Sequence, residues 1–246
     1  MDGVERINIV GVPVDVVRPE QFEAVMFRLT EQAGTKQIVF LSIWNLLKAR
    51  RDTELRRCLE SASLILPISK SILGGARFLK RTMPVRYNPF KTIVTFFTIL
   101  ETRYRSLYLL GGHLGTLSQS ERNIKATYPG LQIVGRCPGY FLKKAEKDIL
   151  SAIFKANPSM VLLGDGVPNG ISWSYGRRNS FGSSIFVYYK DAFAIFSQKK
   201  KRISDATFNA GCEIWLEIFR NPLKIFLVFP FFHYILLLLW NRLLRK

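Results

Sequence analysis

The sequence predicts an α/β protein, with a Rossmann-like parallel sheet flanked by helices and a helical appendage at the C-terminus. The chain has 246 residues, 48% of them hydrophobic, which is enough for one domain with a substantial core. Short apolar runs alternate with segments of helical periodicity, a pattern typical of parallel sheets. The alternation stops at the basic run of residues 199–202, so we expect a main domain at 1–200 and the appendage at 201–246.

The expected strands are short and apolar, and segments of helical periodicity separate them. Residues 7–14 form one or two strands, and six more are expected at 37–41, 63–66, 106–110, 132–134, 160–163 and 185–189. Pro19 begins the first helix, with an apolar stripe that includes Phe22, Val25 and Leu29. Further helices are expected through 55–59, from 69, from 89, over 117–128 and 143–156, near 173 and over 205–220. Because crossovers between parallel strands are right-handed, all strand carboxyl ends should lie at one edge of the sheet.

The amino-acid composition limits which partners the protein can bind and which reactions it can catalyse. The 36 Lys and Arg against 18 Asp and Glu give a formal net charge of +18, which favours nucleic acid, acidic lipid headgroups or a phosphorylated substrate as partner. No nucleic-acid-reading motif is present, so we expect no nucleic acid partner. The sequence has only two histidines and no Asp-x-Asp pair. We therefore do not expect a Ser-His-Asp hydrolase or a metal site, since both need these residue types. The three cysteines have no Cys-x-x-Cys spacing, which argues against disulfides and zinc and fits a reducing compartment.

The C-terminal tail predicts contact with a membrane surface. Residues 225–240 carry no charge, but a spanning helix needs about 20 residues, and Pro230 and His233 interrupt the stretch. We therefore expect a peripheral segment in an anionic membrane interface, on the cytoplasmic face because the chain shows no basic-then-apolar leader. The alternatives are a tail that folds back onto the core or pairs with a second copy in a homo-oligomer. The expected membrane contacts are Arg220, Lys224, Phe231, Phe232, Trp240, Arg242 and Arg245.

Two glycine-rich loops follow buried strands of the expected sheet. The first contains Gly111 and Gly112, and the second contains Gly164, Gly166 and Pro168. Backbone N–H groups in such loops can approach phosphate oxygens, although neither loop has the spacing of a Walker or a dinucleotide-binding motif. A tight turn is the alternative interpretation of each loop.

These two loops belong to a series of short motifs spread along the chain. They are Ile9-Val10-Gly11-Val12-Pro13-Val14-Asp15, Leu109-Leu110-Gly111-Gly112, Tyr128-Pro129-Gly130, Gly139-Tyr140-Phe141, Gly164-x-Gly166-x-Pro168 and Arg220-Asn221-Pro222. On these motifs the chain resembles the WecG/TagA/CpsF glycosyltransferase family across nearly its whole length. The resemblance implies inverting transfer, without metal or cofactor, of a hexose or N-acetylhexosamine from a UDP-sugar to a polyprenyl-diphosphate-linked acceptor in cell-surface polysaccharide synthesis. It also implies that the C-terminal appendage contacts the membrane.

Some positions of the family's site differ in this sequence. Members usually carry Pro-Asp-Gly after the third strand, and its Asp is the proposed general base, whereas Ile68 stands there in this chain. An isoleucine cannot accept a proton. Arg86 is kept and is our candidate cation beside the nucleotide diphosphate. Among substitute bases we place Asp165 first, with turn capping as its alternative role, and Asp191 and Asp205 after it.

Other departures leave two functions open. Phe40 and Ser42 stand where members have Thr-x-Asn. The chain is then either a divergent transferase or a catalytically inactive relative that binds sugar nucleotide or lipid-linked sugar as a scaffold. Trp44 and Trp173 are of a type that stacks on sugars and uracil, but we expect both to be core residues.

Overall fold

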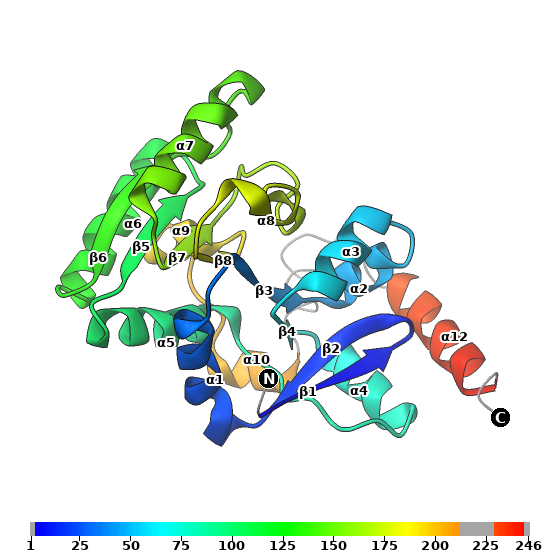
Figure 1. The fold of residues 1–246 in the computed structure, drawn as a ribbon. Coiled ribbons are helices and arrows are strands. Elements are labelled where there is room, and N and C mark those ends of the chain that lie inside the picture. The colour runs from blue at the N-terminus through cyan, green and yellow to red at the C-terminus, as the bar shows by residue number, and fades with distance from the viewer. Residues whose placement is uncertain (1–2, 212–228, 244–246) are drawn as a thin grey trace.

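The computed structural model describes residues 3–211 and 229–243. Its centre is a parallel six-stranded sheet in the order β4-β3-β8-β7-β5-β6, with a separate antiparallel hairpin of β1 and β2 (Figure 1). The described strands are β1 (Val4–Ile9), β2 (Val12–Val17), β3 (Lys36–Leu41), β4 (Leu64–Pro67), β5 (Ser106–Leu110), β6 (Gln132–Cys137), β7 (Met160–Leu163) and β8 (Ile185–Tyr188). The predicted α/β class with a Rossmann-like parallel sheet is confirmed.

Helices connect the strands of the six-stranded sheet and cover both of its faces. They are α1 (Pro19–Glu31), α2 (Ile43–Ala49), α3 (Thr53–Ser61), α4 (Lys70–Phe78), α5 (Pro89–Thr102), α6 (Leu114–Thr127), α7 (Glu146–Ala156), α8 (Ser172–Gly176), α9 (Ala192–Phe196), α10 (Asp205–Ala210) and α12 (Phe229–Leu243), with short 3₁₀ turns at Lys143–Ala145 and Arg178–Ser180. The helix expected over 205–220 begins where predicted but ends early, at Ala210, because Gly211 adopts a left-handed C-cap conformation with a φ of +74°. Residues 212–220 lie outside the described part of the chain.

Alternate residues of each strand divide the core into two layers. On β3, Ile38 and Phe40 join the cluster with α1, α5 and α6, while Val39 and Leu41 join the cluster with the hairpin, α2, α3 and α4. This is the period of two that a strand buried on both faces requires. A third cluster, around the fully buried Trp173, lies under α7 and α8 and confirms that this tryptophan is a core residue.

The edge strand β6 extends three residues beyond the predicted segment. Gly135 is of a residue type common in turns, but Gly135 and Arg136 both pair with β5, after a register shift between Leu107 and Tyr108. A Cβ atom added at Gly135 would overlap the Tyr108 ring, so this glycine allows the ring and the edge strand to approach closely. The extension therefore depends on a contact between strands that local sequence does not reveal.

A buried carboxylate fastens the hairpin to the sheet. Asp15 is fully buried, and its two oxygens accept hydrogen bonds from the Arg6 guanidinium at 2.7 and 2.9 Å. One of these oxygens also accepts the backbone N–H of Ile65 on β4 at 2.7 Å. The hydrogen bond to Asp15 raises the pKa of Arg6. The buried carboxylate of Asp15 is therefore paired with a cation, and the buried N–H of Ile65 has an acceptor.

The C-terminal helix α12 docks on the domain through one side. Tyr234 and Leu238 are buried in the cluster that contains α2 and α4. The Tyr234 hydroxyl lies directly over Gly75 of α4, where an added Cβ atom would overlap it. Phe231 meets Trp44 of α2 edge-on with ring centroids 5.8 Å apart, and Arg242 lies over the Phe78 ring at 4.7 Å. The tail thus folds back onto the core along this side, as one of the sequence alternatives expected.

The opposite side of α12 is apolar and open to solvent. We call it the outer face, and it consists of Phe229, Phe232, Ile235, Leu236, Leu239, Trp240 and Leu243, with exposed fractions between 44% and 69%. In the described residues no helix combines the length and apolar character that crossing a bilayer would take; α12 itself has 15 residues. The predicted contacts Arg220, Lys224 and Arg245 lie outside the described residues.

We predict that Asp15→Ala lowers the free energy of unfolding by about 3 kcal/mol, because the buried N–H of Ile65 loses its acceptor and Arg6 loses two charge-assisted hydrogen bonds. Urea denaturation measures this. Arg56→Ala is the control: its ion pair with Glu60 at 3.1 Å is half exposed on both sides, so its loss should cost less than about 1 kcal/mol. Equal costs for the two variants would contradict the anchoring role of Asp15.

We predict that Gly75→Ala loosens α12, because the new methyl group competes with Tyr234 for the same space. Hydrogen exchange of residues 229–243 should become faster. Gly74→Ala on the same helix has no atom within 4 Å of the new Cβ and should leave that exchange unchanged. Both variants gain helix propensity of about 0.5–1 kcal/mol, so unchanged exchange in Gly75→Ala would contradict the docking contact.

Candidate functional site

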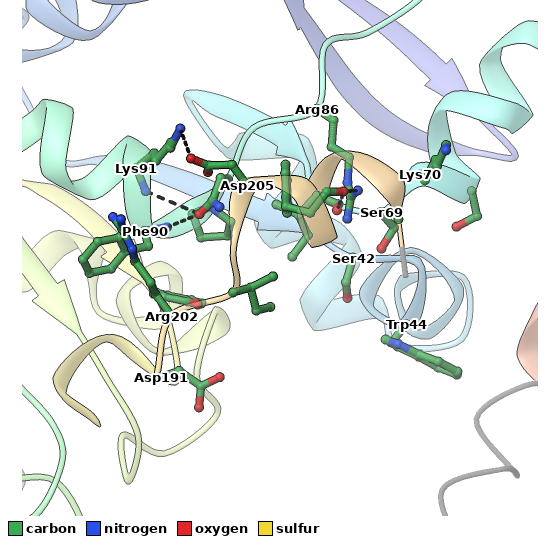
Figure 2. Close-up of a pocket in the computed structure, with 18 of the residues that line it drawn as sticks. Ser42, Trp44, Ser69, Lys70, Arg86, Phe90, Lys91, Asp191, Arg202 and Asp205 are labelled. Atoms are coloured by element: carbon green, nitrogen blue, oxygen red, sulfur yellow. Dashed lines mark hydrogen bonds and ion pairs between the residues drawn. The ribbon is translucent and has the colours of Figure 1, made fainter. Parts of the chain in front are cut away.

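A cavity of about 280 Å³ opens at the carboxyl edge of the sheet, and we call it the sheet-edge cavity (Figure 2). Its lining begins at the ends of three adjacent strands, with Ser42 after β3, Ile68 and Ser69 after β4, and Tyr189 after β8. Ligands in open parallel sheets bind at this edge. Further lining residues are Trp44, Lys70, Arg86, Phe90, Lys91, Asp191, Arg202, Asp205, Phe208 and Phe231.

Arg86 lies in the middle of this lining and connects the sheet to the appendage. Its Nε donates to the Ile68 carbonyl at 2.6 Å, and one terminal nitrogen donates to the Phe208 carbonyl of α10. The guanidinium also lies 3.8 Å from the centroid of the Phe208 ring. The structure thus brings the predicted cation into the cavity and holds it from two sides.

Two serines at the cavity also shape the start of α2. Ser42 accepts the backbone N–H of Asn45 at 3.2 Å as the N-cap, and Ser69 accepts the N–H of Ile43 at 3.0 Å. Each hydroxyl uses its oxygen as acceptor and keeps its proton available for donation. Ile68, beside Ser69, is partly buried against the core and presents an apolar side chain to the cavity.

Of the three carboxylates that were candidate bases, two line the sheet-edge cavity and one does not. Asp191 and Asp205 line the sheet-edge cavity, where Asp191 pairs with Lys200 at 2.6 Å and Asp205 with Lys91 at 2.8 Å. Asp165 is not among the lining residues. Figure 2 shows Asp191 and Arg202 on one side of the cavity and Ser42 and Ser69 on the other.

The two glycine-rich loops lie together, as predicted, but their N–H groups are engaged. Three backbone hydrogen bonds join the loops to each other and to the end of β6: Gly111 N–H to the Cys137 carbonyl at 3.0 Å, Gly112 N–H to the Asp165 carbonyl at 2.6 Å, and Gly164 N–H to the Leu110 carbonyl at 2.8 Å. A Cβ atom at Gly111 would lie 2.7 Å from the backbone nitrogen of Gly164. These glycines allow the backbones of the two loops to touch each other. A diphosphate bound here would need hydrogen-bond donors other than the N–H groups of Gly111, Gly112 and Gly164.

Asp165 belongs to a small polar cluster beside these loops. Its carboxylate accepts the Tyr140 hydroxyl at 2.5 Å, and the Tyr140 ring stacks on His113 with centroids 4.5 Å apart. The hydrogen bond to Asp165 raises the pKa of Tyr140. Gly166 has a φ of +78°, and an added Cβ atom there would overlap the Tyr140 ring, while Pro168 is exposed beyond this turn.

Much of the cavity lining was not predicted from the sequence, and Arg202 and Trp44 are two examples. Arg202 was part of a basic run treated as a boundary, and Trp44 was expected in the core but is only partly buried. Trp44 lies on α2 just after β3, and Arg202 lies just before α10, so the tertiary arrangement brings these two residues to one cavity and no local signal marks either of them. Among the described residues, no three His, Cys, Asp or Glu side chains gather in a way that would hold a metal ion.

Comparison with known proteins gives one family and two relatives. A family model described as the glycosyl transferase WecG/TagA/CpsF family matches residues 7–246. The chain is 20% identical over 177 residues to an N-acetylglucosaminyldiphosphoundecaprenol N-acetyl-beta-D-mannosaminyltransferase of Bacillus spizizenii, covering 72% of this chain and 68% of the relative. It is 21% identical over 174 residues to the enzyme of the same name from Bacillus subtilis, covering 71% and 67%.

We predict that Asp165→Ala lowers the pKa of Tyr140, because the carboxylate that accepts the phenol proton is removed and the phenolate no longer faces a negative charge. A pH titration of Cζ-labelled tyrosine followed by NMR measures this. Asp191→Ala should leave Tyr140 unaffected while it lowers the pKa of Tyr189, which Asp191 helps to raise. A Tyr140 titration that is the same in Asp165→Ala and in the unsubstituted protein would contradict the contact.

Proposed function

The chain belongs to the WecG/TagA/CpsF glycosyltransferase family, and we propose that it transfers a hexose or N-acetylhexosamine from a UDP-sugar to a polyprenyl-diphosphate-linked acceptor. The acceptor class is supported by the names of both Bacillus relatives, which contain a diphosphoundecaprenol-linked N-acetylglucosamine. The product would enter the synthesis of a cell-surface polysaccharide. The observation that carries the proposal is the sheet-edge cavity, because it gathers Arg86, Ser42 and the position of the family's base in one place.

The proposed chemistry uses fixed cations to offset the charge of the leaving nucleotide. Arg86, Lys70 and Arg202 line the cavity, and guanidinium groups bind diphosphates through paired hydrogen bonds. Such positioned charges stabilise a developing anion in the way that a divalent ion does in other transferases. On this basis we propose an inverting reaction in one displacement, without metal or cofactor.

The acceptor hydroxyl needs a base, and Asp191 is the best placed of the three candidates. It follows β8 by three residues at the strand edge and lines the cavity, whereas Asp165 is held by Tyr140 outside the lining. The order of candidates from the sequence therefore changes in our proposal, with Asp191 before Asp205 and Asp165. A positioned base contributes about 10² to 10⁴ in rate.

One observation favours a second function. Ile68 occupies the cavity wall where family members usually carry the acidic base, and it cannot take a proton. The chain would then be a catalytically inactive relative that binds sugar nucleotide or lipid-linked sugar as a scaffold. Titration with UDP followed by a turnover assay separates the two functions, because the scaffold binds UDP and transfers no sugar.

We also propose that the protein is peripheral to an anionic membrane, on its cytoplasmic face. The outer face of α12 supports this, since Phe232, Leu236 and Trp240 are each more than 60% exposed at successive helical turns. Arg242 at the end of the helix is a cation suited to lipid phosphates. The free thiols of Cys58 and Cys137 fit a reducing compartment.

We predict that Asp191→Asn lowers kcat by about 10² to 10⁴, while Asp165→Asn leaves kcat within the same order of magnitude. The assay follows a radiolabelled sugar from its UDP-linked form into an organic extract that contains the lipid-linked acceptor. A large loss in Asp165→Asn together with full activity in Asp191→Asn would contradict the assignment of the base.

We predict that replacing Phe232, Leu236 and Trp240 together by Ser abolishes binding to anionic vesicles, because each removed side chain loses about 1.5–3 kcal/mol of apolar burial. Tyr234 and Leu238 stay in place, so α12 should remain docked. The matched control replaces Val134, Leu142 and Phe154, which are exposed on other elements, by Ser. Vesicle flotation that is unchanged in the first variant would exclude the outer face as the membrane contact.

A further inference from the structure

A second and larger cavity, of about 730 Å³, lies between α2 and α12, and we call it the α2–α12 groove. Its apolar lining consists of Trp44 and Leu47 on α2 and of Phe229 and Pro230 on α12. Its volume lies within the range of about 300–1,000 Å³ of pockets that bury a drug-sized molecule. The groove therefore has both the size and the surface to hold a short length of hydrocarbon.

The groove adjoins the sheet-edge cavity at a single side chain. Trp44 lines both spaces, and Phe231, which lines the sheet-edge cavity, contacts the Trp44 ring edge-on. A flexible chain attached to a group in the sheet-edge cavity reaches the groove by passing this tryptophan.

The other end of the groove leads to the outer face of α12. Phe229 lines the groove and is itself 64% exposed, and Phe232 lies less than one helical turn further along. An apolar path thus runs from the sheet-edge cavity through the groove to the face that we propose to contact the membrane.

The charges around the groove suit an anionic amphiphile. Lys48 and Arg51 lie on its rim, together with His233. Among the described residues of the lining, Asp52 is the one carboxylate; it accepts the N–H of Leu55 at 2.9 Å as the N-cap of α3 and lies 3.6 Å from Lys48. Lys48 thus offsets the charge of Asp52, and Arg51 leaves the rim with a net positive charge that favours an anionic amphiphile.

We propose that the α2–α12 groove holds the first isoprene units of the acceptor's polyprenyl chain. The sugar and diphosphate of the acceptor then occupy the sheet-edge cavity, and the rest of the chain follows the outer face of α12 into the bilayer. This inference rests on the proposed function, since it assigns a place to the lipid of that acceptor. A lipid chain fits better than a peptide or a second copy of the protein, because the groove connects the reaction cavity directly with an apolar surface.

The test compares two acceptors with the same N-acetylglucosamine diphosphate head. The long acceptor carries an undecaprenyl chain, and the short, water-soluble acceptor ends in a methyl group on the diphosphate and carries no isoprene unit. Dissociation constants and transfer rates are measured for both acceptors in detergent with the full chain. The variants are Leu47→Glu and Phe229→Glu, each of which places a charge in the groove and leaves Trp44 intact. The control is Phe154→Glu on α7, where a phenylalanine of similar exposure lies outside the groove.

The unsubstituted protein and Phe154→Glu should bind the long-chain acceptor at least tenfold more tightly than the short one. In Leu47→Glu and Phe229→Glu this preference should fall about tenfold, as expected for the loss of one apolar contact, with little change for the short acceptor. Transfer to both acceptors with a preference that the variants do not alter would overturn the groove assignment and leave the proposed function intact. Binding of neither acceptor would overturn both. A concentration-dependent dimer that Leu47→Glu dissociates would assign the groove to a second copy instead.

Discussion

The contact between Tyr234 and Gly75 is the constraint on which the functional surfaces of this protein depend. Because α4 has no side chain at position 75, the tyrosine ring sinks onto the helix backbone and Leu238 follows it into the core. This contact fixes the rotation of α12 about its own axis. Burial raises the pKa of Tyr234, and its hydroxyl has no hydrogen-bond partner among the described residues, so the ring is held by packing alone.

The rotation of α12 determines which of its side chains face the sheet-edge cavity and which face solvent. With Tyr234 turned inward, Phe231 reaches the Trp44 ring and closes one side of the sheet-edge cavity. The same orientation turns Phe232, Leu236 and Trp240 outward. A soluble surface helix would carry polar residues there. One buried tyrosine therefore links the wall of the proposed reaction site to the proposed membrane contact.

Much of the fold could be predicted because it is local or periodic. β5 and β7 were predicted to the residue, since a continuous apolar run is the property that burial on both faces requires. Arg86 was found from its motif and does line the cavity. The engaged N–H groups of Gly111 and Gly112 could not be foreseen, because their acceptors lie on segments about 25 to 55 residues away. The two sides of α12 could not be told apart from the sequence, since the tail is apolar all round and the buried side is set by contacts with distant residues such as Gly75 and Trp44.

The central claim is that sugar transfer takes place in the sheet-edge cavity, under the docked tail. Hydrogen exchange of the full chain with and without saturating UDP tests this most directly, because it locates the nucleotide without requiring turnover. The account predicts slower exchange at the segments that follow β3, β4 and β8 and over 86–91, which together line the cavity. Protection confined to the loops of Gly111 and Gly164, or protection on α7 with no change around Arg86, would contradict it.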